Sequence, residues 1–283
     1  MFLQQKNKIT ILAVLFVITV IVWASVFIEA KESDILEVDF YDVGQGDAIF
    51  IETGNGRQIL VDGGPSSTIL EKLGREMPFY DRYIDLIILT HPEYDHINGL
   101  IEVIKRYDIG AVITNGVVRD TGQYKEWIRI IEQENIPVYI AKVYGEIDFG
   151  NDIKMDILYP FENLTGQEVS NTNNSSVVSK LIYKDFELLL TGDIEKSVER
   201  KLVDSNLNLQ ADVLKVPHHG SKTSSTEEFL KAVASVINII QAGKDNKYGH
   251  PHDEVLARMA NVFVTGQSGD IQILSDGKEF LIE

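Results

Sequence analysis

The sequence predicts an α/β fold in which two sheets pack face to face, preceded by one membrane-spanning helix. Short apolar runs typical of buried strands alternate with stretches of helical spacing, which is the pattern of layered α/β domains. Residues 85–91 (DLIILTH) and 212–218 (DVLKVPH) share one pattern of Asp, four mostly apolar residues, a turn-forming residue and His. This repeat indicates two similar halves whose sheet edges bring their histidines together.

The predicted membrane helix is the uncharged run at residues 9–28, ITILAVLFVITVIVWASVFI. A helix of this length spans the roughly 30 Å hydrocarbon layer. Lysines precede the run and mostly acidic residues follow it, so residues 1–8 are expected in the cytoplasm and the catalytic domain outside the cytoplasmic membrane. A cleaved signal peptide is the alternative, although its apolar region is usually only about 7 to 15 residues long. Residues 29–35 are then a linker, and residues 36–283 form one hydrolase domain.

The elements of that domain are predicted from periodicity and turn residues. The predicted strands are 36–40, 48–52, 58–61, 85–90, 111–114, 138–141, 153–158, 177–190 with a turn at 184–185, 213–216 and 236–241. The predicted helices are 67–75, 97–106, 124–134, 194–203, 227–233 and 253–259. Tight turns are expected at 54–56 and 276–277.

Composition restricts the chemistry of any functional site. The chain has 283 residues, 26 of them basic and 43 acidic, and a net charge of −17. This charge repels polyphosphates unless metal ions or a local basic patch reverse the field, so stable binding to duplex DNA is disfavoured. Cysteine is absent. There are therefore no disulfides and no thiolate ligands, and a metal site must use nitrogen and oxygen.

All six histidines lie in three short segments beside Pro or Gly: 91–96 (HPEYDH), 218–219 (HH) and 250–252 (HPH). In the first segment His91, Glu93, Asp95 and His96 follow a buried strand. Ionised carboxylates there would need a cationic partner, and neutral imidazole with carboxylate is what divalent metals bind. The sequence therefore predicts a metallohydrolase that binds a pair of divalent metal ions.

Further donors follow later strands. Asp193 ends the segment LLLTGD, where it could bridge two ions or cap the next helix. His219 is expected as a further ligand and His218 as a hydrogen-bond donor to substrate or to a metal-binding carboxylate, but the spacing does not decide which of the two binds metal. His250 suits transition-state stabilisation or proton delivery to the leaving group. His252 either shares that role or caps the helix that starts at residue 253.

Glycine-rich turns complete the predicted site. Asp42, Asp47 and Asp62 lie in DVGQGD and VDGG, where they are expected to orient ligand histidines or to bind backbone amides. Neither turn has the spacing of a nucleotide-phosphate loop. Two ions about 3.5 to 4 Å apart would activate water for in-line attack and neutralise an anionic transition state, with Asp95 at the reacting centre.

These motifs, in this order, resemble the metallo-β-lactamase superfamily, and most closely the hydrolase domain of ComEC-like competence proteins. The resemblance rests on DVGQGDA, VDGG, THPEYDH, NNSSVV, LLLTGD, VPHHGS and YGHP and covers about 36–283. It implies a four-layer αββα sandwich with a metal site at one edge. It further implies a phosphodiesterase or nuclease-like enzyme.

Carried over by position, the resemblance assigns His91 to a first metal site, Asp95, His96 and His219 to a second, and Asp193 to a bridge between them. Glu93 replaces the second histidine of the motif. Where another histidine ligand is expected the sequence has NNSS at 173–176, so Asn174 is expected beside the ligands rather than among them. These departures weaken the first site, which would then be empty or favour an oxygen-preferring ion such as manganese over zinc. The expected cofactor is therefore one or two divalent ions, zinc or manganese.

Three functions are consistent with this sequence. The first is a membrane-anchored, metal-dependent phosphodiesterase that acts on nucleic acid or on a smaller phosphodiester. The second is a hydrolase of a lactam, lactone or thioester, because the fold supports many reactions. The third is a catalytically degenerate binding module, which the replacement of two histidine ligands would favour.

Overall fold

The computed structural model describes the backbone of residues 2–29 and 34–283, and the side chains of residues 7–22 and 34–283. The chain divides into two compact units, Met1–Ser33 and Asp34–Glu283. Helix α1 (Phe2–Glu29) makes up the first unit. Most of the predicted linker falls on residues 30–33, which lie outside the described residues.

The predicted membrane anchor is not supported. A crossing needs about 20 consecutive apolar residues in one helix. Among the residues described, no helix combines the required length with the required apolar character. The predictions of a single-pass helix at 9–28 and of an extracytoplasmic catalytic domain in the cytoplasmic membrane are therefore corrected.

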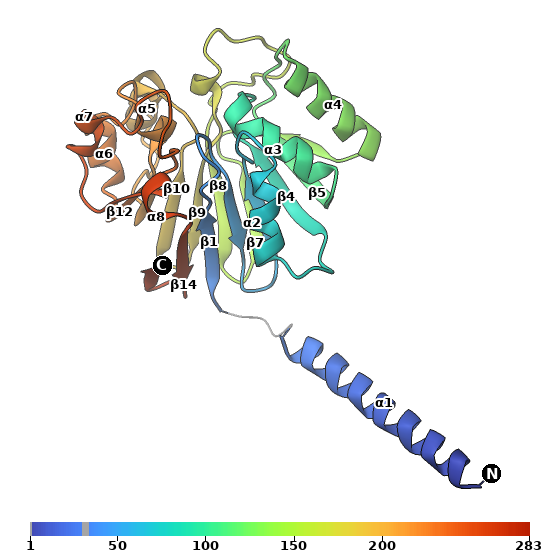
Figure 1. Cartoon of the computed structure of the whole chain (residues 1–283). Helices are drawn as coiled ribbons and strands as arrows, with labels where there is room; N and C mark the ends of the chain where they lie inside the picture. The colour runs from blue at the N-terminus through green and yellow to red at the C-terminus, as the bar shows by residue number, and fades with distance from the viewer. Residues whose placement is uncertain (1, 30–33) are drawn as a thin grey trace. The chain divides into compact units, whose positions relative to one another are not determined.

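The second unit contains two mixed sheets (Figure 1). The first has the order β15-β14-β1-β2-β3-β4-β5-β6 and the second the order β13-β12-β11-β10-β9-β8-β7. The strands of the first sheet are β1 (Leu36–Phe40), β2 (Ile49–Glu52), β3 (Gln58–Val61), β4 (Tyr83–Leu89), β5 (Asp108–Thr114), β6 (Val138–Ile140), β14 (Ile271–Ser275) and β15 (Phe280–Ile282). Those of the second are β7 (Glu146–Gly150), β8 (Ile153–Tyr159), β9 (Val178–Tyr183), β10 (Phe186–Leu190), β11 (Val213–Lys215), β12 (Ile237–Ile240) and β13 (Val262–Val264).

Helices cover the outer face of each sheet, as Figure 1 shows. The first sheet carries α2 (Thr68–Glu76), α3 (Tyr94–Ile104) and α4 (Gly122–Glu134). The second carries α5 (Lys196–Asp204), α6 (Glu227–Val233), α7 (Asp253–Leu256) and α8 (Thr265–Ser268). Short helical turns occur at Asn173–Ser175 and Pro217–Gly220. The predicted αββα sandwich of two facing sheets is confirmed.

Strand alternation explains the layers. In β1, Leu36, Val38 and Phe40 point into the apolar core between the sheets, so Glu37 and Asp39 face the helices on the other side. Separate apolar cores lie beneath α2–α4 and beneath α5–α8. Each half joins antiparallel strands to a parallel run, β3-β4-β5-β6 in one sheet and β10-β11-β12-β13 in the other. The two similar halves expected from the repeated motif are present.

Two strands at sheet edges were not predicted from the sequence. Neither β7 nor β13 was expected, and both lie at the edges of the second sheet. In β7 only Phe149 is buried. A strand paired on one side needs few apolar residues, so its periodicity is weak.

A glycine contact fixes α3 against the turn after β3. The amide of Gly63 donates to the carbonyl of His96 and that of Gly99 to the carbonyl of Gly64, both at 2.9 Å. A Cβ on Gly99 would lie 1.8 Å from the carbonyl oxygen of Gly63. This close approach determines where the first turn of α3 begins.

Gly99→Ala should therefore lower the free energy of unfolding by about 1 to 3 kcal/mol, because the added methyl overpacks a backbone contact. Urea titration measures the change. Gly74→Ala in α2 is the matched control, since no atom lies within 4 Å of its Cβ position, and its better helix propensity should leave stability equal or about 0.5 kcal/mol higher. Equal effects of the two substitutions would contradict the close-approach argument.

Candidate metal centre

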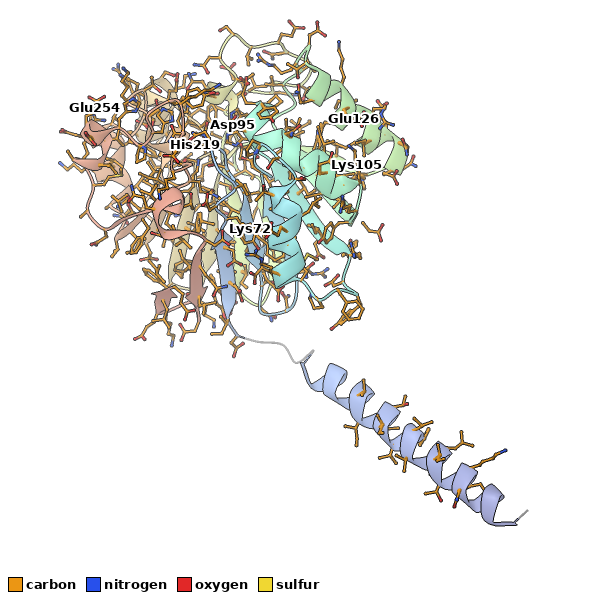
Figure 2. The ribbon with its side chains drawn as sticks, in the orientation of Figure 1. Lys72, Asp95, Lys105, Glu126, His219 and Glu254 are labelled. Atoms are coloured by element: carbon orange, nitrogen blue, oxygen red, sulfur yellow. The ribbon has the colours of Figure 1, made fainter. Side chains whose placement is uncertain are left out.

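The donor side chains meet where several strands end. Asp62 follows β3, and His91 follows β4 at the start of α3. Asp193 follows β10, and His219 lies in the turn after β11. Carboxyl ends of strands at a sheet edge are the usual place for sites in α/β folds. Figure 2 shows Asp95 of the first half close to His219 of the second.

Four residues form a compact ligand set: Asp95, His96, Asp193 and His219 each offer one donor atom within 4.8 Å of the others. Oδ2 of Asp193 lies 3.3 Å from Nε2 of His96 and 3.2 Å from Nε2 of His219. Oδ2 of Asp95 lies 3.3 Å from Nε2 of His219. Both Nε2 atoms are buried and have no hydrogen-bond partner among the described residues. Two orphaned imidazole nitrogens facing two carboxylates fit a divalent metal ion.

Hydrogen bonds at the opposite ring nitrogens orient the two histidines. Nδ1 of His96 lies 2.7 Å from Oδ2 of Asp62. Asp62 also accepts from the amide and the hydroxyl of Thr90, at 2.8 and 2.6 Å. Nδ1 of His219 lies 2.7 Å from the carbonyl oxygen of Gln241. Donation from Nδ1 leaves each Nε2 lone pair free for a metal.

The field at the site is strongly negative. Burial opposes charge on His96, but the carboxylates of Asp193 and Asp62 outweigh burial and hold the pKa of His96 well above its usual value. Asp193 and Asp47 do the same for the pKa of His219. Burial raises the pKa of Asp95, yet His219 and His96 bring the net value below its usual range. The carboxylates that raise the pKa of these two histidines also attract metal cations to the site.

His91 and Glu93 are the two residues expected at a second ion site, and the protein engages them differently. Nδ1 of His91 lies 3.0 Å from the Thr90 hydroxyl, and its buried Nε2 has no hydrogen-bond partner among the described residues. Burial and the neighbouring His96 lower the pKa of His91 to about 3, so its ring is neutral. Oε1 of Glu93 instead accepts from the Thr172 hydroxyl and pairs with Arg119 at 3.0 Å. The structure thus makes His91 available as a ligand and directs Glu93 elsewhere.

His218 is held by protein contacts on both ring nitrogens. The Asn173 amide donates to Nε2 at 3.1 Å, so the proton lies on Nδ1, which is 3.1 Å from the Thr223 hydroxyl. Burial lowers the pKa of His218. The ring lies beside the ligand set, with its centroid 6.2 Å from that of His219. The geometry makes His219 the member of the adjacent pair that joins the ligand set.

His250 faces the same site with one nitrogen less constrained. The Gln45 amide lies 3.5 Å from Nδ1, which favours a proton on Nε2. The ring stacks between Tyr248 and His219, with centroids 5.7 and 6.3 Å away. Burial and the neighbouring histidines lower the pKa of His250 to about 4. A neutral imidazole with Nε2–H can donate a hydrogen bond to a substrate oxygen. His252 caps α7 through its backbone carbonyl, without a side-chain cap bond.

The residues expected to support the ligands, Asp42, Asp47, Asp62 and Asn174, separate into two groups. Asp62 and Asp47 contact ligand histidines, Asp47 at 3.3 Å from Nδ1 of His219. The carboxylate of Asp42 accepts instead from the amide of Gly44 within its own turn. Asn174 bonds to the backbone and the carboxylate of Glu195, at 3.0 and 3.2 Å, rather than to a ligand. Asp42 and Asn174 thus shape adjoining loops.

Lys215 was missed by the sequence analysis. Its side chain is buried in β11, pairs with Asp47, donates to the carbonyl of Gly192 at 3.0 Å and lies 3.5 Å from Oδ1 of Asp193. Burial raises the pKa of Asp47, but the Lys215 ammonium together with His219 and His96 outweighs burial, and the net pKa is lowered. The one charged residue within the apolar run VLKV could have indicated this buried lysine.

Asn115 was also missed. It is fully buried after β5, and its amide donates to the carbonyl oxygens of Thr90 and Ser175, at 3.1 and 2.9 Å. It therefore ties the β4–α3 junction of the first half to the NNSS segment of the second. The sequence AVITN could have indicated this residue, because a polar side chain there ends an apolar strand.

Comparison with known proteins identifies the family. Residues 41–244 match the sequence profile of the metallo-beta-lactamase superfamily. The chain belongs to this superfamily. Metallo-beta-lactamase membership and the donor set together make the chain a metal-dependent hydrolase in the broad sense, with a divalent ion as its expected cofactor.

The predicted resemblance to ComEC-like competence proteins is confirmed. ComE operon protein 3 of Bacillus subtilis is 32% identical over 258 residues, which are 83% of this chain and 32% of that protein. Recombination protein 2 of Haemophilus influenzae is 28% identical over 279 residues, which are 96% of this chain and 33% of that protein. The chain thus spans about a third of the length of these relatives.

A solved structure supports the fold. YhfI of Bacillus subtilis, a metallo-beta-lactamase fold protein, superposes with a TM-score of 0.54 at 12% identity, and the match covers 89% of this chain and 100% of that one. At this identity the similarity concerns the fold alone.

Asp62→Asn should weaken metal binding about 10- to 100-fold, because residues that orient ligand histidines typically contribute that much to affinity. Competition with a colorimetric chelator measures the affinity. Asp42→Asn is the matched control from the neighbouring turn and should bind metal like the unaltered chain. Equal losses in both would show that Asp62 does not act through His96.

Lys215→Met should lower the free energy of unfolding of the metal-free chain by about 3 to 5 kcal/mol, since it leaves Asp47 and Asp193 without their buried cation. Added metal should restore part of this loss. Lys180→Met is the matched control: Lys180 is also buried and pairs with Glu187 at 3.0 Å, away from the donor set. Its loss should be unaffected by metal, and a shared metal response would refute the role of Lys215.

Proposed function

We propose that this chain is a metal-dependent phosphodiesterase that acts on nucleic acid or on a smaller phosphodiester. The observation that carries the proposal is the set of two imidazoles and two carboxylates without a cysteine, at a strand-end edge flanked by neutral histidines. Oxygen-rich donors suit ions that also bind phosphoryl oxygens.

The substrate class is inferred partly from the relatives. One of them is named a recombination protein, and recombination acts on nucleic acid. The net charge of −17 disfavours stable binding of long duplex DNA. A bound divalent ion would reduce that repulsion where a single phosphodiester enters the site.

The residues around the ion would divide the work. Bound at the four-residue set, a divalent ion supplies Lewis acidity and lowers the pKa of water. Asp62 and the Gln241 carbonyl keep His96 and His219 in the ligand orientation. The carboxylate of Asp95 is about a third exposed, whereas those of Asp193 and Asp47 are buried. Asp95 is therefore the carboxylate of the set that water and substrate reach.

His250 is the candidate for the leaving-group side. Its contact with the Gln45 amide favours a proton on Nε2, and that N–H can hydrogen-bond to the departing oxygen. His218 has both nitrogens engaged by Asn173 and Thr223. It therefore holds the neighbouring loops in place unless substrate displaces one of these contacts.

Hydrolysis of bis(p-nitrophenyl) phosphate by the full chain tests the proposal. After metal is removed with a chelator, release of nitrophenol should stop, and manganese or zinc should restore it. Asp95→Ala should reduce turnover about a thousandfold or more, because several kcal/mol of transition-state stabilisation depend on the ion. Asp120→Ala, an exposed carboxylate that pairs with Lys125, is the control and should retain full activity.

Two other outcomes are diagnostic. Metal-dependent opening of a chromogenic cephalosporin, without release of nitrophenol, would replace the phosphodiester by a lactam. No turnover of either compound by a folded, metal-loaded chain would indicate a binding module.

A further inference from the structure

A second group of acidic residues lies on the outer face of the first sheet, away from the donor set described above. Glu37 and Asp39 occupy alternate positions in β1 and therefore share one face. Glu76 is the last residue of α2, which covers that face. Carboxylate oxygens of Glu37, Asp39 and Glu76 all lie within 4.8 Å of one another.

The negative charge of this group is not balanced by nearby cations. Lys72 of α2 pairs through its ammonium with both oxygens of Asp270, at 2.7 and 2.8 Å. Over residues 34–283, no lysine or arginine forms an ion pair with Glu37, Asp39 or Glu76. The negative end of the α2 dipole adds to the repulsion at Glu76.

Asp39 is the buried member of the group, with 4% of its surface exposed. The amide of Gln272, directly opposite on β14, donates to Oδ1 at 2.9 Å. Oδ2 is buried and has no hydrogen-bond partner among the described residues. Burial, and then the charges of Glu37 and Glu76, raise the pKa of Asp39 to about 7. The side chain thus offers a free, desolvated oxygen to the group.

Tyr41 is an independent indication of a ligand. It continues the alternation of Glu37 and Asp39, is 1% exposed, and its hydroxyl has no hydrogen-bond partner among the described residues. Burial raises the pKa of Tyr41, and the charges of Asp39, Glu76 and Asp270 raise it further, so the hydroxyl stays protonated. A buried, unpartnered hydroxyl is rare in a folded protein.

We propose that Glu37, Asp39 and Glu76 bind a divalent cation that prefers oxygen ligands, calcium or magnesium, with Tyr41 beside it. Carboxylates and neutral oxygens are the donors that these ions take, whereas the imidazoles of the catalytic set favour transition metals. The exposed Glu76 provides the route of entry, and the buried Asp39 provides the desolvated ligand. The cation would join the end of α2 to β1, just before the chain enters the loop that carries Gln45 and Asp47.

Calcium binding to the metal-free full chain tests the site by isothermal titration calorimetry and thermal unfolding. We expect one calcium ion per chain and a rise in melting temperature. Asp39→Asn and the exposed Glu76→Gln should each weaken calcium binding at least tenfold. Asp95→Asn is the matched control at the catalytic set and should leave calcium binding unchanged, so failure here and failure of the phosphodiesterase proposal are distinguishable.

The competing possibility is that the group holds a proton in place of a cation. The titratable groups that act on Asp39 are Glu37, Glu76, Asp270 and Tyr41, and Lys72 pairs with Asp270. With a folded pKa of about 7, above the unfolded value, Asp39 contributes stability that is complete at about pH 4 and lost by about pH 7. A loss of stability over this range that Asp39→Asn abolishes, without any effect of calcium, would overturn the proposal. Glu76→Gln decides the question if Asp39→Asn does not fold.

Discussion

Burial of negative charge is the constraint on which this structure depends. Asp47, Asp62 and Asp193 lie within the protein at 1, 0 and 3% exposure, although an unpaired buried carboxylate costs several kcal/mol. Lys215 is the one lysine or arginine among the described residues that pairs with any of the three. Its single charge cannot balance them. The remaining compensation comes from imidazoles, backbone amides and, when it is bound, a divalent ion. A metal is therefore part of the electrostatic balance of the fold as well as of its chemistry.

The architecture meets this constraint by dividing the charges between two similar halves. The first half supplies Asp62, Asp95 and His96, and the second supplies Asp193, His219 and Lys215. Neither half alone completes the ligand set or neutralises its carboxylates. The apolar core between the sheets fixes their separation, and the Gly63–Gly99 contact sets the position of α3. Backbone packing beside the ligand set thereby determines ligand distances, since a displaced helix would move His96 away from Asp193.

The sequence predicted the features that depend on local pattern. Strand ends followed by His or Asp located the ligand set, and strand-helix alternation predicted two facing sheets. It could not separate Asp42 from Asp47, because both lie in one turn and only tertiary packing brings Asp47 to His219. Lys215 was missed because a charge in an apolar strand is recognisable only when its partners are known. The predicted membrane span was wrong: among the described residues, no helix is both long enough and apolar enough to cross a membrane.

His91 and Glu93 differ in how readily they could contribute to a second ion. His91 is neutral and has a free Nε2, so it could serve a second ion without rearrangement. Glu93 could not, because its carboxylate accepts from Thr172 and pairs with Arg119. To reach an ion it would have to release the guanidinium, leaving Arg119 as a cation beside the incoming ion. Glu93 would exchange its pair with Arg119 for a contact with the ion, and the Arg119 guanidinium would then repel that ion. An ion at the four-residue set meets no such repulsion. The four-residue set is thus preformed for one ion, whereas Glu93 can contribute to a second only if the Glu93–Arg119 pair opens.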